Sequence, residues 1–127
     1  MATRSFIGIQ NHNGTVTGVY CHHDGYLEGV GKTLLENYND QKKATQLVEL
    51  GSLSSLGEDL DVTQAYHRDR GEDLDVSEYL SPSAVRFNDG GYEYIYLLTR
   101  EGWLYAERHD RDGSPKYKPL ASAKELL

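Results

Sequence analysis

Cysteine is almost missing from this chain, because Cys21 is the only one among its 127 residues. A single cysteine excludes an intramolecular disulfide and a zinc site built from several thiolates. Free thiols persist in reducing compartments, so this count favours a cytosolic protein. We interpret Cys21 as a small buried hydrophobic residue rather than as a nucleophile.

Long apolar segments are missing as well. No run approaches the roughly 18 residues that a membrane-spanning helix needs. The first ten residues, MATRSFIGIQ, have neither the apolar core nor the small-residue cleavage site of a secretory signal. We therefore expect a soluble cytoplasmic protein without membrane contact.

Basic residues are outnumbered, with 13 Lys and Arg against 20 Asp and Glu and a formal net charge of −7. Proteins that bind the nucleic-acid backbone normally present a cluster of Lys and Arg, so we expect no direct binding of that kind. The charge is concentrated in residues 57–80, where eight acids stand against two arginines. The remaining residues are close to neutral.

The aromatic residues are mostly tyrosine, with ten Tyr against two Phe and one Trp. Rings that carry a hydroxyl need a polar partner or a route to water when they are buried. We expect much of the core to be built from such rings, and some of the hydroxyls to be available for a binding surface.

Alternating β-branched and aromatic residues predict two strands at 4–10 and 15–22, joined by a tight turn that ends at Gly14. Gly8 and Gly18 lie inside these strands. Missing side chains at such positions indicate either a bulge or a group that packs closely on top, such as a helix or an aromatic ring.

Apolar residues then recur at helical spacing and predict one helix over 27–38. Asp40 is a suitable N-terminal cap for a second helix, and Gly51 suits the left-handed position that ends it. Further along, residues 92–98 and 103–108 alternate in the manner of strands and predict a second hairpin.

These elements predict an α+β fold, in which an antiparallel sheet of two β-hairpins carries two helices on one face. The length fits a single domain, 1–127, with the acidic residues 57–80 as a loop or insertion. The hexapeptide GEDLDV occurs in this segment at 57–62 and again at 71–76. Two copies are too few for a solenoid, so we interpret them as a local duplication or a coincidence.

The stretch YCHHDGY, residues 20–26, gathers two histidines and an aspartate between two tyrosines. One interpretation is a transition-metal site, since imidazole and carboxylate are suitable ligands. That site would take its ligands from His22, Asp24, His67 and Asp69, with His109 as a further candidate. The other interpretation is that Asp24 and Gly25 form the turn into the first helix, with Asp24 as its cap.

The second polar segment is YHRDRGED, residues 66–73, in which Arg68 and Arg70 are the only cations of the acidic stretch. On an extended segment, alternate side chains project to one side. The two arginines would then form a two-armed clamp for a carboxylate or phosphate. Alternatively they neutralise nearby acids in surface ion pairs that contribute little to stability.

Five pieces of the chain resemble a family of small uncharacterised proteins of bacteriophages, prophages and plasmids. They are TRS at 3–5, YCHHDGY where the family has YCHWDGY, VGKTLLENY, LGSLSSLG and YHRDRGED. His23 stands where Trp is usual, so His22 and Asp24 are the better candidates for a role. The resemblance implies a mobile-element origin, a single domain and location in the host cytosol, and it supplies no activity.

We expect the two polar segments to meet around one pocket with tyrosine walls. The candidate binding residues are Tyr20, His22, Asp24, Tyr26, Tyr66, Arg68, Arg70 and Glu72.

The composition and these residues favour a non-enzymatic accessory protein that binds or inhibits a host protein, or binds a small anionic ligand, without a cofactor. The alternative is a metal-dependent hydrolase or nucleotide-processing enzyme that uses the four ligands named above. A third hypothesis is a structural or assembly role as a homo-oligomer, such as a homodimer, built through a sheet edge of the 92–108 hairpin.

Overall fold

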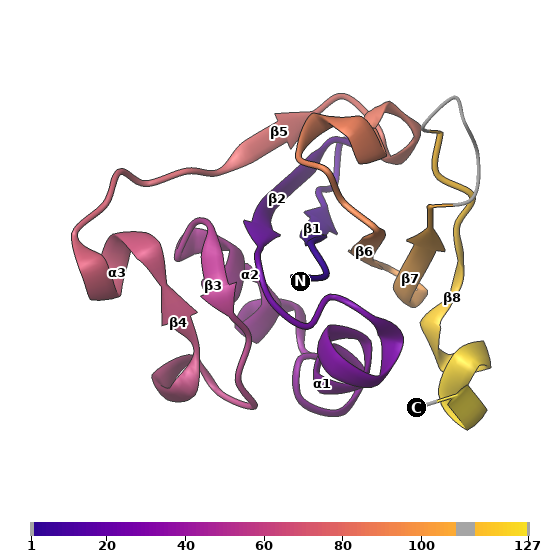
Figure 1. Ribbon diagram of the computed structural model, residues 1–127. Coiled ribbons are helices and arrows are strands. Elements are labelled where there is room, and N and C mark those ends of the chain that lie inside the picture. The colour runs from indigo at the N-terminus through magenta and orange to yellow at the C-terminus, as the bar shows by residue number, and fades with distance from the viewer. Residues whose placement is uncertain (1, 109–113, 127) are drawn as a thin grey trace.

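A mixed sheet forms the centre of the computed structural model, which describes residues 2–108 and 114–126. The strand order in the described residues is β4-β3-β2-β1-β6-β7-β8, and β5 pairs with β2 on the same edge as β3 (Figure 1). The strands are β1 Ser5–Gln10, β2 Val16–Cys21, β3 Leu53–Ser55, β4 Gln64–Ala65, β5 Ser77–Tyr79, β6 Tyr94–Thr99, β7 Gly102–Glu107 and β8 Lys118–Pro119.

Helices are few and short. A π-helical turn, Leu27–Gly31, leads directly into α1, Lys32–Asn37; α2 covers Gln41–Glu49 and α3 covers Tyr66–Arg70. Single 3₁₀ segments occur at Leu60–Val62, Pro82–Ala84, Phe87–Asp89 and Leu120–Leu126. The structure therefore belongs to the predicted α+β class, and within the described residues no helix combines the length and the apolarity that a membrane crossing requires.

Strands β1 and β2 run antiparallel and bring two glycines opposite each other, Gly8 beside Gly18. A Cβ atom at Gly8 would lie 2.8 Å from the ring of Phe6, and one at Gly18 would overlap the same ring. The prediction that something packs on these glycines is confirmed, and the group is the aromatic ring of Phe6. The turn ends at Gly14, whose φ of 88° is in the left-handed region.

The prediction of an antiparallel sheet is wrong for two of the strand contacts. β1 pairs with β6 in parallel from Ser5 beside Tyr94 to Ile9 beside Leu98, and β2 meets β3 in parallel. Parallel neighbours need a long crossover connection, which here is supplied by the helices and by the acidic segment. Periodicity identifies strands, but it does not identify their neighbours.

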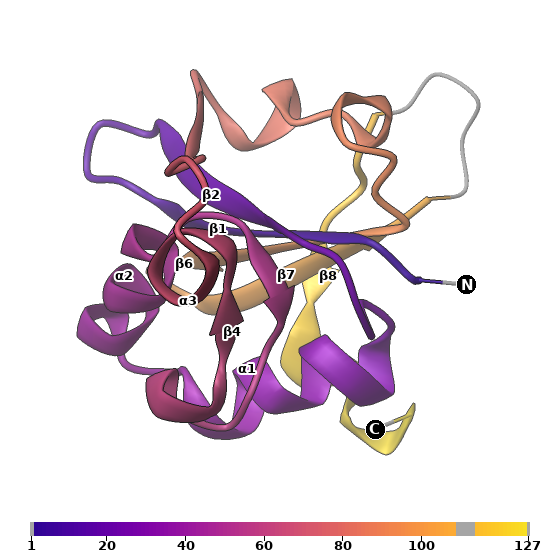
Figure 2. The ribbon, with the colours of Figure 1, turned by 60° about the vertical axis from the view of Figure 1, so that its left-hand side comes forward.

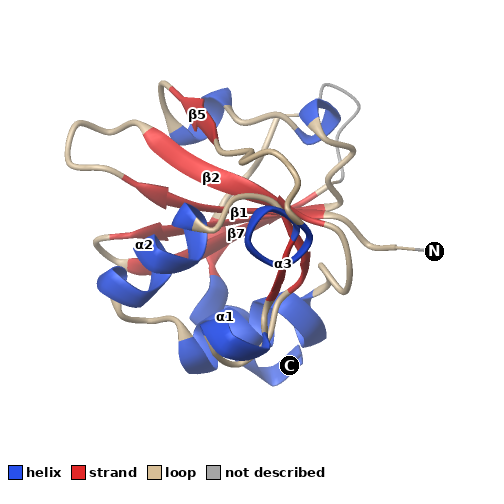
Figure 3. Cartoon of the chain, turned by 90° about the vertical axis from the view of Figure 1, so that its left-hand side faces the viewer, coloured by secondary structure: helices blue, strands red, loops and turns tan. Residues whose placement is uncertain are grey.

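The two faces of the sheet are covered by different kinds of structure (Figures 2 and 3). The apolar sides of α1 and α2 pack on one face, where Leu34 and Leu47 meet Ile7 and Val19 in the larger core cluster. On the other face, the 3₁₀ segments between 82 and 92 cover the sheet, and Phe87 is part of a second cluster. α1 and α2 therefore lie on one face of the sheet, and irregular chain closes the opposite face.

The two residues predicted to begin and end α2 have the expected geometry. The Asp40 carboxylate accepts a hydrogen bond from the Lys42 amide at 3.1 Å, as an N-terminal cap does. Gly51 follows the helix with a φ of 81°, a conformation that favours glycine.

Two fully buried tyrosine hydroxyls find polar partners, as the composition predicts. Tyr38 donates to the carbonyl oxygen of Gly57 at 2.9 Å, and Tyr96 donates to that of Gly25 at 2.7 Å. Each bond joins segments that are far apart in the chain. These two hydroxyls thus fix the helices and the segment after β2 and have their own hydrogen-bonding capacity satisfied.

The acidic segment, predicted to be a loop, contains β4, α3 and β5. Its two GEDLDV copies have different structures. The first includes a 3₁₀ turn in which the Asp59 carboxylate accepts from the Leu60 amide at 2.8 Å, and the buried Thr63 hydroxyl donates to the Asp59 carbonyl at 2.9 Å. Every residue of the second copy is exposed, and none of them belongs to a helix or strand. The repeat is therefore not a structural repeat.

Candidate functional site

A groove of about 750 Å³ opens where the second GEDLDV copy passes across β2. Its lining comes from Tyr20, Ser52, Tyr66, Gly71, Glu72, Asp73, Leu74 and Asp75. We call residues 71–80 the acidic strap, because they run from the end of α3 through β5 and carry four acids and no basic residue. In Figure 1 the strap crosses the top of the molecule from α3 to β5.

Hydrogen bonds at both ends of the second hexapeptide hold it in place. At its start, the Glu72 amide donates to the Tyr66 carbonyl at 3.1 Å, and the Glu72 carbonyl lies 2.7 Å from His67 Nδ1. Further along, the Ser52 hydroxyl donates to Asp75 Oδ2 at 3.2 Å. The intervening residues are exposed, so the strap is fixed by its ends and not by a core of its own.

Three of the eight candidate binding residues line this groove, namely Tyr20 from the first polar segment and Tyr66 and Glu72 from the second. His22 lies next to Tyr20, with its Nδ1 hydrogen-bonded to the Tyr20 hydroxyl. The two polar segments therefore meet through their tyrosines.

The remaining candidates of the first segment, Asp24 and Tyr26, are exposed, do not line the groove and bond to each other at 3.3 Å. Asp24 has a φ of 58°, and its carbonyl accepts from the Val30 amide at 2.8 Å. The prediction of a turn at this position is confirmed. The prediction that the Asp24 side chain caps the helix is wrong, because the helical turn begins after Tyr26 without a side-chain cap.

The predicted arginine clamp is wrong, because residues 66–70 form the helical turn α3 and not an extended segment. Side chains two positions apart on a helix point to different sides. Arg68 forms a bidentate pair with Asp69, both bonds being 2.9 Å, and also donates to the carbonyls of Leu60 and Thr63. Arg70 lies over the ring of Tyr66, 5.0 Å from its centre.

The four-ligand metal site is also wrong. Within residues 2–108 and 114–126, no three His, Cys, Asp or Glu side chains gather closely enough to hold an ion. Asp69 is already bound to Arg68 and to the Ala65 amide at 2.8 Å. His67 bonds to the Glu72 carbonyl, and His109 lies outside the described residues.

Burial and neighbouring charges shift the pKa values of side chains in and beside the groove. Burial raises the pKa of the Cys21 thiol to about 12, so this side chain is the unreactive hydrophobic residue that we predicted. Partial burial also raises the pKa of the Tyr20 hydroxyl. The pKa of His22 is lowered, first by desolvation and then by repulsion from His23 and Arg4, which favours a neutral ring.

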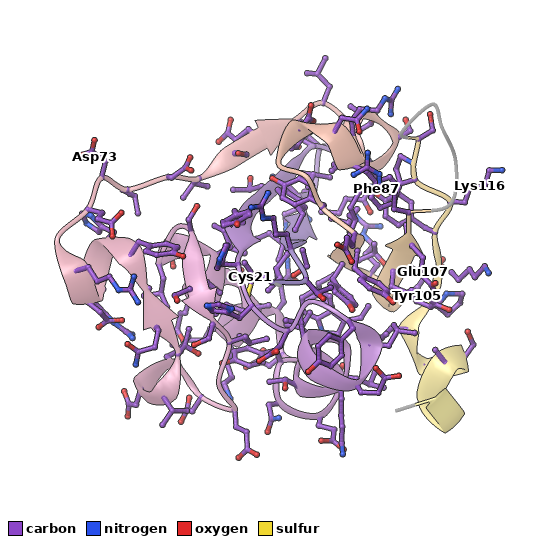
Figure 4. The ribbon with its side chains drawn as sticks, viewed as in Figure 1. Cys21, Asp73, Phe87, Tyr105, Glu107 and Lys116 are labelled. Atoms are coloured by element: carbon purple, nitrogen blue, oxygen red, sulfur yellow. The ribbon has the colours of Figure 1, made fainter. Side chains whose placement is uncertain are left out.

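Sequence reasoning missed the part of the site that is most exposed. Leu74, Val76 and Leu80 have exposed fractions of 54%, 36% and 86%, and they alternate with acids. Figure 4 shows the Asp73 side chain directed away from the body of the molecule. The alternation DLDVSEYL, 73–80, is itself a strand signal, but it overlaps the second acidic hexapeptide, and the concentration of acids favoured the interpretation as a loop.

A second groove of about 690 Å³ lies at the opposite ends of β1, β6 and β7. It is lined by Gln10, Asn11, His12, Gly14, Asn39, Gln41, Leu98, Thr99, Arg100, Glu101, Gly102 and Leu104. None of the candidate residues contributes to it.

No family model, curated protein or solved structure matches the chain. The resemblance to mobile-element proteins thus remains an expectation, and the role of the site rests on its geometry and charge.

Proposed function

We propose that this chain is a non-enzymatic binding protein whose acidic strap docks on a basic surface of another protein. One observation carries the proposal. The strap combines three exposed apolar side chains with four acids, and it is held in a defined path by the bonds at Ser52 and Tyr66.

The apolar residues of the strap are the source of affinity. Fully burying one leucine is worth about 1.5–3 kcal/mol, and Leu74 and Leu80 are both mostly exposed. A monomeric surface rarely keeps several such residues together unless they contact a partner.

The carboxylates of the strap are the source of selectivity. Glu72, Asp73 and Glu78 form no ion pair within the described residues, so their charge is available to a partner. Such charges accelerate association with a basic protein and exclude acidic ones. Carboxylates can also stand in for phosphates, so a nucleic-acid-binding surface of a host nuclease or defence complex is a suitable partner.

A small anion is a poorer ligand for the same groove. Glu72, Asp73 and Asp75 line it and repel negative charge. Arg68, the cation expected to hold an anion, is engaged by Asp69 and two backbone carbonyls. The geometry thus favours the protein partner among the ligands considered.

The proposal is tested by affinity capture from a host lysate with a matched pair of variants. The strap variant carries Glu72→Gln, Asp73→Asn and Glu78→Gln. The control variant removes the same number of exposed acids elsewhere, through Glu36→Gln, Glu49→Gln and Glu101→Gln.

We expect a basic protein to be retained by the wild type and the control variant and lost by the strap variant. With that protein purified, affinity for the wild type should fall as salt concentration rises. Equal retention by both variants, or no basic protein that depends on the strap, would overturn the proposal.

A further inference from the structure

We propose that the partner adds to the sheet as an extended basic strand along the edge of β5 that no described strand occupies. This inference rests on the proposed function and specifies how the same strap binds. The partner segment would have the alternating pattern apolar-x-Lys/Arg-x-apolar.

The edge of β5 is available for pairing. β5 is bonded to β2 through three residue pairs, Val16 with Tyr79, Thr17 with Glu78 and Gly18 with Ser77. On its other side, no strand pairs with it in the described part of the chain. An unpaired edge presents a row of backbone donors and acceptors, which is the template used when a peptide adds to a sheet.

The two faces of β5 differ in a way that suits this mode of binding. Tyr79 faces the sheet interior, where its ring packs edge-on against Phe6 with centroids 5.6 Å apart and its hydroxyl bonds to Asp89 at 2.9 Å. Glu78 pairs with Thr17 on the opposite face, the face that α2 covers further along the sheet. That second face of β5 is exposed.

Val76 and Leu80 flank β5 directly, and a period of two continued beyond both ends of the strand assigns them to the face of Glu78. The exposed order on this face is therefore apolar, acidic, apolar. Side chains directly opposite each other on neighbouring strands interact, so the best partner places a lysine or arginine opposite Glu78 and apolar residues opposite Val76 and Leu80.

A second copy of this chain is not a suitable occupant of the edge. Two acidic straps would bring four acids against four, and like charges opposite each other destabilise a strand pair. The 92–108 hairpin is a poorer edge as well, since β8 already pairs with β7 at Leu104 and Tyr105. Charged residues on an edge strand often prevent pairing with another chain. Here the apolar residues beside Glu78 leave the edge of β5 able to bind a partner strand.

The test uses a capped synthetic peptide, Lys-Val-Thr-Lys-Thr-Val-Lys, whose palindromic order suits either strand direction. It is titrated into the isotope-labelled full chain while amide chemical shifts and hydrogen exchange are followed by NMR. The control peptide replaces both threonines with proline, which keeps the charge and removes backbone donors.

We expect the first peptide to shift the amides of β5 and to slow their exchange by about tenfold or more at saturation. The proline peptide should bind about tenfold more weakly, because strand pairing depends on main-chain hydrogen bonds. The variant Glu78→Lys should lose the preference for the basic peptide and instead favour Glu-Val-Thr-Glu-Thr-Val-Glu.

Equal binding of the proline peptide, or the absence of protection at β5, would overturn strand addition. Such a result would leave the proposed function intact if the strap variant still loses its basic partner. Failure of the strap variant to lose any partner would remove both proposals. Self-association of the chain through β5, detected by sedimentation, would assign the edge to a second copy and contradict the inference.

Discussion

The hydroxyl of Ser52 donates to the carboxylate of Asp75 at 3.2 Å and thereby fixes the acidic strap to the turn after α2. The two residues are 23 positions apart, and the same turn places Gly51 against the Leu74 side chain. A Cβ atom at Gly51 would lie 2.8 Å from Leu74, so the strap approaches the backbone closely at this point.

Replacement of Ser52 by alanine should loosen the strap with little effect on the core. A partly exposed hydrogen bond of this kind contributes about 0.5–1.5 kcal/mol, so the midpoint of unfolding should change only slightly. Hydrogen exchange at residues 72–76 should become faster. Unchanged exchange there would mean that the bond does not hold the strap.

Because the Phe6 ring lies against Gly18, we expect the addition of a single methyl group at position 18 to lower the stability of the fold. Gly18→Ala should destabilise the fold by about 1–3 kcal/mol, since the added methyl group overlaps the ring. Chemical denaturation measures the loss. Adding Phe6→Leu to the same chain should recover part of it, whereas additive losses in the double variant would show that the ring is not the cause.

Arg68 should contribute to stability and Arg70 should not. Arg68→Lys removes the bidentate pair with Asp69 and the bonds to two carbonyls, and because both residues of the pair are exposed we expect a loss of about 0.5–1.5 kcal/mol. Arg70→Lys is the matched control, because Arg70 lies over the Tyr66 ring and its side chain forms no hydrogen bond or close ion pair among the described residues. Equal effects of the two substitutions on urea unfolding would contradict this assignment.

His22 should make stability depend on pH near neutrality. Its pKa is lowered in the fold, so the folded protein binds fewer protons than the unfolded chain as pH falls. The contribution of the neutral ring is therefore complete above its ordinary value of 6.5 and decreases as pH falls below it. The variant His22→Asn should show a weaker pH dependence between about pH 7 and 5 in thermal unfolding.

His23→Asn is the companion measurement for the same group. Repulsion from His23 is one of the causes of the lowered pKa, so its removal should raise the pKa of His22 in an NMR titration. A pKa that stays constant would assign the shift to desolvation and to Arg4.

Local features of the fold could be predicted from the sequence because their causes are local. The cap at Asp40, the left-handed turn at Gly51 and the close approach at Gly18 each depend on one residue type in one conformation. The parallel pairing of β1 with β6 could not be predicted, since it depends on which strands become neighbours after the chain crosses over.

The candidate site was predicted less well for the same reason. Tyr20 and Tyr66 do meet in one groove, but Arg68 is directed to the carbonyls of Leu60 and Thr63, which only the folded path of the acidic segment brings close. The turn α3 is five residues long and ends at Gly71 in a left-handed conformation. A segment so short and so polar has almost no helical period by which to identify it.

The two GEDLDV copies give this protein a built-in pair for mutagenesis with identical local sequence. Asp59 and Asp73 are the same position of the hexapeptide, yet the first carboxylate closes a helical turn and the second projects freely from the strap. The change of either residue to asparagine thus has the same chemistry and the same sequence neighbours. The difference in unfolding free energy between the two variants therefore measures the effect of tertiary context on the same residue in the same hexapeptide.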